Sequence, residues 1–191
     1  AGLVLAVLAG LALEEMDETL HDPAQASEAL GLAPLGSTPK VGSGDVEGEL
    51  EDRKSPLYEA YFSIRSNLAF STAHGFPRVL AVTSTRPGEG KSSTALALGI
   101  IQARTGARVL LVDADMRLPS VHALLGCENA AGLANLLAGA DDWQALVVPT
   151  GFDNLSALVA GPHPPNAAEL LTGERFPRLL GELAGQFDHL I

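Results

Sequence analysis

The sequence has almost no cysteine, few aromatic residues and few positive charges. Its 191 residues include one cysteine, 5% aromatic residues and 12 Lys or Arg against 23 Asp or Glu, which gives a formal net charge of -11. A single cysteine, Cys127, cannot form an internal disulfide, so nothing in the chain requires an oxidising compartment. The basic residues form no stripe, and nucleic acid rewards clustered positive charge, so we expect no nucleic acid partner.

Metal-binding clusters are also missing from the sequence pattern. The histidines are scattered along the chain without a second ligand at the spacing of a metal site, so we expect no zinc site. These histidines are His21, His74, His122, His163 and His189.

Hydrophobic residues are plentiful, at 47% of the chain, which suits one buried core with flanking segments. The chain begins on an apolar run, Ala1–Leu13, which is shorter than the roughly 20 residues of a bilayer crossing. Such a run fits a buried helix, a signal-peptide core or the last turns of a membrane helix, and we favour the third. The acidic residues at 14–18 count against this choice, because Lys or Arg is expected beside a cytoplasmic membrane end.

The segment that follows is interpreted as a linker and then a helix. Gly36–Ser55 is small, polar and acidic, and has too few large apolar residues to order itself. After it, apolar residues recur at helical spacing from Leu57, behind a proline that suits a helix start. We therefore predict a helix over Leu57–Ser71.

A strand, a helix and a second strand come next. Arg78–Ser84 and Ala107–Asp113 are compact apolar runs of the kind found in buried parallel strands, and Ser92–Thr105 between them is Ala/Leu-rich and helical. This order predicts a right-handed crossover in a parallel sheet. Further on we predict short helices over Pro119–Leu125 and Gly132–Leu137 and a strand over Leu155–Ala160. A capping box from Asn166 to Glu169 is expected to open a helix through Leu171. A helix over Phe176–Leu183 and a central strand that begins over Phe187–Ile191 follow.

The strongest chemical signal is the loop Thr83–Ser93, TSTRPGEGKSS, between the first strand and its helix. Gly88 and Gly90 allow backbone N–H groups to turn toward an anion, and the helix that follows adds its positive N-terminal end. Lys91 can bridge phosphates and the Ser92 hydroxyl can ligate Mg²⁺. An ordinary strand-to-helix turn is the alternative for this short pattern alone.

A second signal follows the next strand, where VLLVDADMR ends in two carboxylates and a guanidinium. Ligands of open α/β sheets gather at the carboxyl ends of the strands, so Asp113 and Asp115 are expected beside the loop. Two carboxylates there can hold hydrated Mg²⁺ and accept a proton from an attacking hydroxyl. A capped, solvated strand end explains one Asp but explains the pair poorly.

Together these motifs resemble the bacterial tyrosine autokinases of the polysaccharide co-polymerase group, relatives of the MinD/ParA-like septum-positioning and partitioning ATPases. TSTRPGEGKSS looks like the family's Walker A motif, although Thr85 stands where its first Gly usually lies, and VLLVDADMR looks like Walker A′. The stretches RLPSVH, GLANLLAG and GPHPPNAAELL are also family-like, and the resemblance runs from about Leu57 to Ile191. Partitioning ATPases usually carry an early signature Lys in the loop, where this chain has Arg86 and Pro87, which favours the kinase branch.

The resemblance implies a doubly wound, mostly parallel α/β sheet, ATP and Mg²⁺ as cofactors, and protein tyrosine as acceptor. It also implies a role in exopolysaccharide or capsule polymerisation and export at the cytoplasmic side of a bacterial inner membrane. Asp113 and Lys91 would be catalytic, with Asp113 as base or metal-linked carboxylate, and Ser92 and Asp115 would serve the metal. The implied cofactor-binding residues are Arg86, Pro87, Gly88, Glu89, Gly90, Lys91, Ser92 and Ser93.

The resemblance further implies self-association into a ring through a helix motif Glu-x-x-Arg-x-x-Arg. Here the motif has Glu59 and Arg65, but Phe62 replaces its middle arginine, so an ordinary solvated helix face is an equal alternative. The family's Walker B carboxylate and tyrosine-rich tail are not in this sequence, so we expect a C-terminally truncated domain, inactive by itself. The expected organisation is a membrane-helix end at 1–13, a juxtamembrane segment and linker at 14–56, and the kinase domain at 57–191. A partitioning-type ATPase and a co-polymerase scaffold with a structural nucleotide site stay open as other functions.

Overall fold

The computed structural model describes residues 27, 30–40 and 46–191. The predicted membrane-helix end, Ala1–Leu13, lies outside these residues. Within them, no helix is long and apolar enough to cross a bilayer. The chain divides into two units, residues 1–37 and 38–191, and the fold presented below is that of the second.

A four-stranded sheet with the order β2-β3-β1-β4 forms the centre of this unit. β1 (Val109–Val112) pairs in parallel with both β3 (Leu155–Leu158) and β4 (His189–Leu190), and only β2 (Val148–Pro149) is antiparallel. The predicted mostly parallel α/β sheet is therefore confirmed. The strand predicted to begin near the end of the chain is β4, which lies beside β1 as the last strand in the sheet order and has a single bridge to Val79 on its other side.

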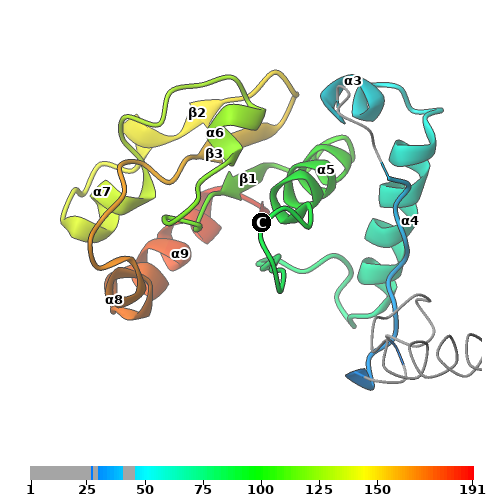
Figure 1. Cartoon of the computed structure of the whole chain (residues 1–191), viewed down its shortest axis with the longest axis horizontal. Coiled ribbons are helices and arrows are strands. Elements are labelled where there is room, and N and C mark those ends of the chain that lie inside the picture. Colours follow the sequence, from blue (N-terminus) through cyan, green and yellow to red (C-terminus); the bar gives the residue numbers. More distant parts are fainter. Residues whose placement is uncertain (1–26, 28–29, 41–45) are drawn as a thin grey trace, which may run out of the picture. The chain divides into compact units, whose positions relative to one another are not determined.

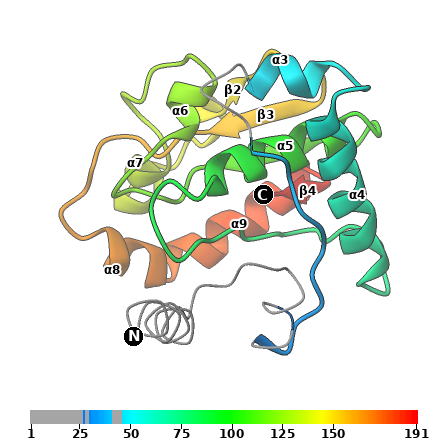
Figure 2. The same cartoon turned by 45° about the vertical axis from the view of Figure 1, so that its right-hand side comes forward.

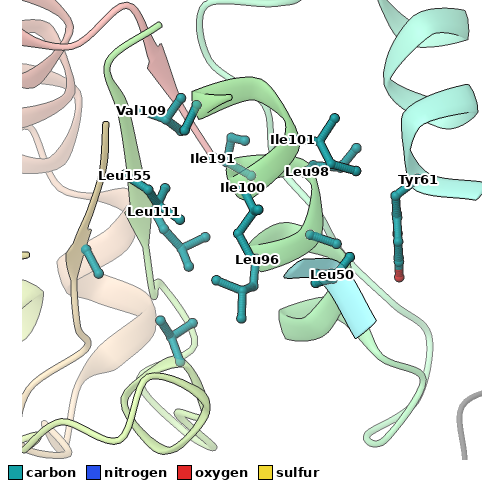
Figure 3. Close-up of a cluster of buried hydrophobic side chains, with 14 of the residues drawn as sticks. Leu50, Tyr61, Leu96, Leu98, Ile100, Ile101, Val109, Leu111, Leu155 and Ile191 are labelled. Atoms are coloured by element: carbon teal, nitrogen blue, oxygen red, sulfur yellow. The ribbon is translucent and has the colours of Figure 1, made fainter. Parts of the chain in front are cut away.

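Helices cover both faces of the sheet. Successive side chains of a strand point to opposite sides, and apolar side chains on both sides of β1 are buried against helices. In β1, Val109 and Leu111 pack with the first set of helices, whereas Leu110 packs with the second. The first set includes α4 (Pro56–Phe70), α5 (Lys91–Ala103) and α6 (Val121–Leu124), and the second is α7 (Leu133–Ala138), α8 (Ala167–Thr172) and α9 (Arg175–Gln186). Figure 1 shows α4 and α5 on one side of β1 and α7, α8 and α9 on the other, and Figure 3 shows the core that the first set forms.

The helix α4 begins where its sequence predicts. Ser55 is the N-cap and its hydroxyl accepts a hydrogen bond from the Tyr58 amide at 3.0 Å, while Pro56 occupies the first turn. Tyr61 is buried and its hydroxyl lies 2.9 Å from the Thr94 hydroxyl of α5. Tyr61 is therefore a packing residue between α4 and α5.

The segment predicted as a linker contains a helix, α3 (Val46–Glu51). Leu50 of α3 is fully buried, and Figure 2 shows α3 near the ends of α4 and α5. Arg104 at the end of α5 donates a hydrogen bond from Nη1 to the Leu50 carbonyl at 2.7 Å and lies under the Tyr58 ring. The prediction that Gly36–Ser55 cannot order itself is therefore wrong from Val46 on, because one leucine and an arginine from a distant helix supply the contacts.

The strand predicted over Arg78–Ser84 is reduced to a single bridge between Val79 and Leu190. Its hydrogen bonds join Leu80 N to the Leu190 carbonyl at 2.9 Å and Leu190 N to the Arg78 carbonyl at 2.8 Å. The segment therefore lies beside the two-residue strand β4 and contacts it through one bridge, without forming a ladder.

The other predicted helices and the strand β3 are confirmed within a few residues of their expected ends. The capping box at α8 is wrong, because Asn166 makes no side-chain cap bond and its amide instead donates to the Glu169 carboxylate at 3.2 Å. The 3₁₀ helix at Gln144–Leu146 and the edge strand β2 were not predicted, since neither has a clear apolar period.

Candidate functional site

A cavity of about 590 Å³ opens at the carboxyl end of β1, between β1 and the segment that precedes α5. One part of its wall is polar and includes Lys91, Ser92 and Asp115. The other part is apolar and includes Phe176 and Leu180 of α9. The predicted site residues that line it are Arg86, Pro87, Lys91, Ser92, Asp113 and Asp115, whereas Gly88, Glu89, Gly90 and Ser93 lie in the same loop outside the wall.

The loop before α5 has the backbone of an anion-binding turn. Gly88 and Gly90 have φ values of 81° and 84°, in the left-handed region that favours glycine. Gly90 is the N-cap of α5, so the first amides of this 13-residue helix have no acceptor within the helix. These amides and the helix dipole make the start of α5 favourable for a bound anion.

Glu89 holds the loop together from within. Its carboxylate accepts hydrogen bonds from the Thr85 amide at 2.9 Å, the Arg86 amide at 3.1 Å and the Thr85 hydroxyl at 3.1 Å. The hydrogen bond from the Arg86 backbone, helped by those from Thr85, keeps the pKa of Glu89 below its usual value. In this structure Glu89 therefore shapes the loop, and the Thr85 and Arg86 amides are bonded to it.

Lys91 and Asp115 form an ion pair across the cavity, with 2.7 Å between Nζ and Oδ2. Each side chain is about a quarter exposed, at 28% and 26%. Burial raises the pKa of Asp115, but hydrogen bonds from Lys91 and from the amides of Leu118 and Arg117 outweigh it, so the pKa lies below its usual value. The sequence placed these two residues near each other, and the structure shows them in direct contact.

Asp113 is buried, with 4% of its surface exposed, and is bonded to backbone amides on both oxygens. Oδ1 accepts from the Asp115 amide at 3.1 Å, and Oδ2 accepts from the Ser120 and Val121 amides at 3.0 Å each. These bonds fix the turn after β1 to the start of α6. Asp113 thus determines where Asp115 lies relative to Lys91.

Ser120 is a site residue that the sequence reasoning missed. Its hydroxyl donates a hydrogen bond to the Ser92 hydroxyl at 2.6 Å, which links the turn after β1 to the loop before α5. The available signal was its position, a serine directly before a short helix and seven residues after Asp113.

Glu59 and Arg65 lie on α4 and do not line the cavity. Glu59 is exposed, whereas Arg65 is partly buried and donates from Nε to the Gln102 side chain of α5 at 2.8 Å. Phe62 is 47% exposed and stacks with Tyr58 at a ring distance of 6.2 Å. In this chain Arg65 therefore has a partner on its own α5, and Phe62 adds an apolar element to the exposed face of α4.

The residues at the cavity fit a nucleotide with a hydrated divalent cation. The Ser92 hydroxyl and the Asp115 carboxylate are oxygen ligands of the kind that Mg²⁺ prefers. Nowhere in the described part of the chain do three or more His, Cys, Asp or Glu side chains gather into a metal-binding group. A cation here would take its remaining ligands from phosphate oxygens and water, which is how Mg²⁺ is usually held beside a nucleotide.

The sequence profile described as CbiA, the CobQ/CobB/MinD/ParA nucleotide binding domain, matches residues 80–187. That range includes the loop before α5, β1 and the turn with Asp113 and Asp115. The chain belongs to this family of nucleotide-binding domains.

Within the family the chain groups with bacterial tyrosine kinases. It is 37% identical to the tyrosine-protein kinase YwqD of Bacillus subtilis over an alignment of 142 residues. This alignment covers 74% of this chain and 60% of YwqD. Its structure is similar to the kinase domain of the Escherichia coli tyrosine kinase ETK, with a TM-score of 0.82 and 25% identity over 91% of this chain and 72% of that domain. It is also similar to cobyrinic acid a,c-diamide synthase of Mycobacterium smegmatis with a bound ATP analog and magnesium, with a TM-score of 0.52 and 30% identity over 60% of this chain and 49% of the synthase. The chain spans about 60% of the length of the curated relatives that it matches first.

Proposed function

We propose that the chain is the ATP-binding part of a protein tyrosine kinase that phosphorylates tyrosines of its own kind and regulates exopolysaccharide or capsule polymerisation and export. The observation that supports this most is the meeting of Lys91, Ser92 and Asp115 at the start of α5, in a domain whose relatives are named tyrosine-protein kinases. The ATP analog and magnesium bound to the related synthase support ATP·Mg²⁺ as the cofactor.

In this proposal each polar residue of the cavity has one task. Lys91 and the first amides of α5 would hold the phosphates, while Ser92 and Asp115 would hold the hydrated metal. Asp113 is the base or a metal-linked carboxylate, and its bonds to three backbone amides fix its orientation. Bound Mg²⁺ would neutralise negative charge on the phosphates.

The ion pair between Lys91 and Asp115 has to separate when ATP·Mg²⁺ binds. Without nucleotide the two charges neutralise each other at 2.7 Å. With nucleotide bound, Lys91 would pair with the phosphates and Asp115 would serve the metal, so each residue would exchange one partner of opposite charge for another. The ion pair thereby keeps Lys91 and Asp115 in position before ATP·Mg²⁺ binds, and breaking it would lower the affinity for ATP modestly.

The acceptor tyrosine comes from outside the described core. The chain has two tyrosines, Tyr58 and Tyr61, and Tyr61 is 5% exposed and hydrogen-bonded to Thr94. Tyr58 is half-buried, between the Phe62 ring and the Arg104 guanidinium. Neither tyrosine lines the cavity, so we expect that the 191-residue chain alone does not phosphorylate itself on tyrosine.

The expected domain layout belongs to the same proposal. Residues 1–13 would be the end of a membrane helix, 14–56 the connection and 57–191 the kinase domain, on the cytoplasmic side of an inner membrane. Self-association through Glu59 and Arg65 and contact with the polysaccharide export machinery would follow from that location. The helix α3 adds that the connection packs on the kinase domain from Val46 onward.

Mass spectrometry after incubation with ATP and Mg²⁺ tests the proposal. Phosphotyrosine is expected in a longer protein that carries this chain and tyrosines beyond it, and not in the 191-residue chain. Phosphotyrosine at a similar rate in the short chain would show that the essential residues are assigned wrongly. ATP hydrolysis without phosphotyrosine in the longer protein would favour a partitioning-type ATPase, and neither product would favour a scaffold.

A further inference from the structure

A second cavity, of about 540 Å³, lies beside the phosphate-binding cavity. Leu118 is part of the wall of both, so the turn after β1 separates the two cavities. The other side of the second cavity is formed by the segment between β3 and α8 and by the start of α8. Its polar and proline lining includes Arg117, His163, Pro164, Pro165, Asn166 and Glu169.

The wall between the cavities is held in place from both sides. On the phosphate side, Asp115 Oδ1 accepts hydrogen bonds from the amides of Arg117 at 3.3 Å and Leu118 at 3.0 Å. On the other side, His163 Nδ1 lies 2.6 Å from the Met116 carbonyl, which can only accept, so Nδ1 is the donor. The same carboxylate that pairs with Lys91 therefore fixes the position of Arg117.

Among the described residues, the second cavity holds one cation, Arg117, and one carboxylate, Glu169, and the two do not form an ion pair with each other. Arg117 is exposed, and its guanidinium makes no hydrogen bond or ion pair with the described part of the chain. The one carboxylate, that of Glu169, is on α8 and accepts a hydrogen bond from the Asn166 side chain. An unpaired guanidinium is suited to a carboxylate or phosphate, to which it can donate two parallel hydrogen bonds.

We propose that the second cavity binds the acceptor of the kinase reaction, a peptide segment in which an acidic residue stands next to the tyrosine. Arg117 pairs with the acidic side chain, and the rigid surface of Pro164 and Pro165 packs against the phenol ring. The shared wall at Leu118 then places the tyrosine next to the phosphate-binding cavity. Arg117 is thus a specificity-determining residue, and this inference rests on the proposed function.

Peptide binding to the 191-residue chain tests this subsite without requiring phosphoryl transfer. Two fluorescein-labelled octapeptides with one central tyrosine are compared by anisotropy, one with glutamates and one with lysines beside the tyrosine. Salt of about 0.15 M limits the contribution of the chain's distant charges, because the Debye length is then about 8 Å. We expect the glutamate peptide to bind about 10-fold tighter, in the range that one charged hydrogen-bonding contact contributes.

Arg117→Glu should reverse this preference, so that the lysine peptide binds tighter. Arg178→Glu is the matched control, because Arg178 is an exposed arginine on α9 that lines neither cavity, and it should keep the preference of the wild type. An unchanged preference in Arg117→Glu, or equal loss in both variants, would overturn the subsite.

A second readout separates this inference from the proposed function. If a longer protein that carries the chain forms phosphotyrosine but Arg117→Glu leaves its preference between the two peptides unchanged, the kinase assignment stands and the subsite is rejected. If the preference reverses but no transfer occurs, the subsite stands and the kinase assignment is rejected.

Discussion

Replacing Lys91 by methionine should weaken ATP binding. The loss of binding free energy should be smaller than for a lysine that has no other partner before ATP binds. A charged hydrogen bond contributes about 1.5 to 3 kcal/mol. Lys91 must first leave Asp115, and a partly exposed pair of this kind is worth up to about 1 kcal/mol. The net loss in Lys91→Met is therefore about 0.5 to 3 kcal/mol, or roughly 2- to 150-fold in Kd.

The partner residue should show an effect whose sign depends on the metal. In EDTA, Asp115→Asn frees Lys91 and removes a negative charge near the phosphates, so ATP should bind about 2- to 5-fold tighter. In Mg²⁺ the same variant loses a metal ligand, so ATP should bind more weakly than to the wild type. This reversal would not follow if Asp115 were only a structural cap of the turn.

Isothermal titration calorimetry with ATP, in EDTA and in Mg²⁺, measures both effects. Lys54→Met is the matched control, because Lys54 is an exposed lysine that does not line the cavity, and its Kd should equal that of the wild type. Unchanged affinity in Lys91→Met would refute the assignment of the phosphate loop. Weaker binding of Asp115→Asn in both buffers would refute the exchange of partners.

Three further predictions concern the fold. Leu50→Ala should lower the free energy of unfolding by about 2 to 4 kcal/mol in urea denaturation, and a loss below about 0.5 kcal/mol would mean that α3 is not packed on the core. Gly132→Ala should prevent stable folding, because its Cβ would lie 2.0 Å from the Val159 carbonyl oxygen, and a normal melting curve would contradict this geometry. Arg108 lowers the pKa of Asp188 to about 2, below the unfolded value of about 3.9. Asp188→Asn should therefore lower Tm by its full amount above pH 4, and the difference in Tm from the wild type should close as the pH falls through about 2. A difference in Tm that does not change with pH would contradict the ion pair.

The elements with strong local signals could be predicted from the sequence. The helix after Ser55 has a capping residue, a proline in its first turn and an apolar period, and the structure places it within one residue of the expected range. The strand before Asp113 is a continuous run of buried apolar residues, and the structure confirms it as β1. In these segments the local sequence and the tertiary packing favour the same structure.

The misses occur where distant contacts decide the outcome. α3 has one large apolar residue, Leu50, and is stabilised by Arg104, which follows it by more than fifty residues in the chain. The segment after Arg78 has the composition of a strand, but it pairs with β4 only through the bridge between Val79 and Leu190. Neither fact can be read from the segment itself.

The candidate site shows the same division. The positions of Lys91, Ser92 and Asp115 around one cavity followed from a loop and a strand end that a parallel sheet brings together. The contacts between them did not follow, since the sequence does not show that Ser120 binds Ser92 or that Glu89 is bonded to its own loop.

The fate of the terminal phosphate of ATP is the most direct test of the central claim. Labelled γ-phosphate is followed in a longer protein that carries this chain and tyrosines beyond it, and its partition between tyrosine and water is measured for the wild type and for Lys91→Met. We expect label on tyrosine in the wild type and little or none in the variant. Label that is released only as inorganic phosphate, with no phosphotyrosine, would contradict the assignment of the chain to a working tyrosine kinase.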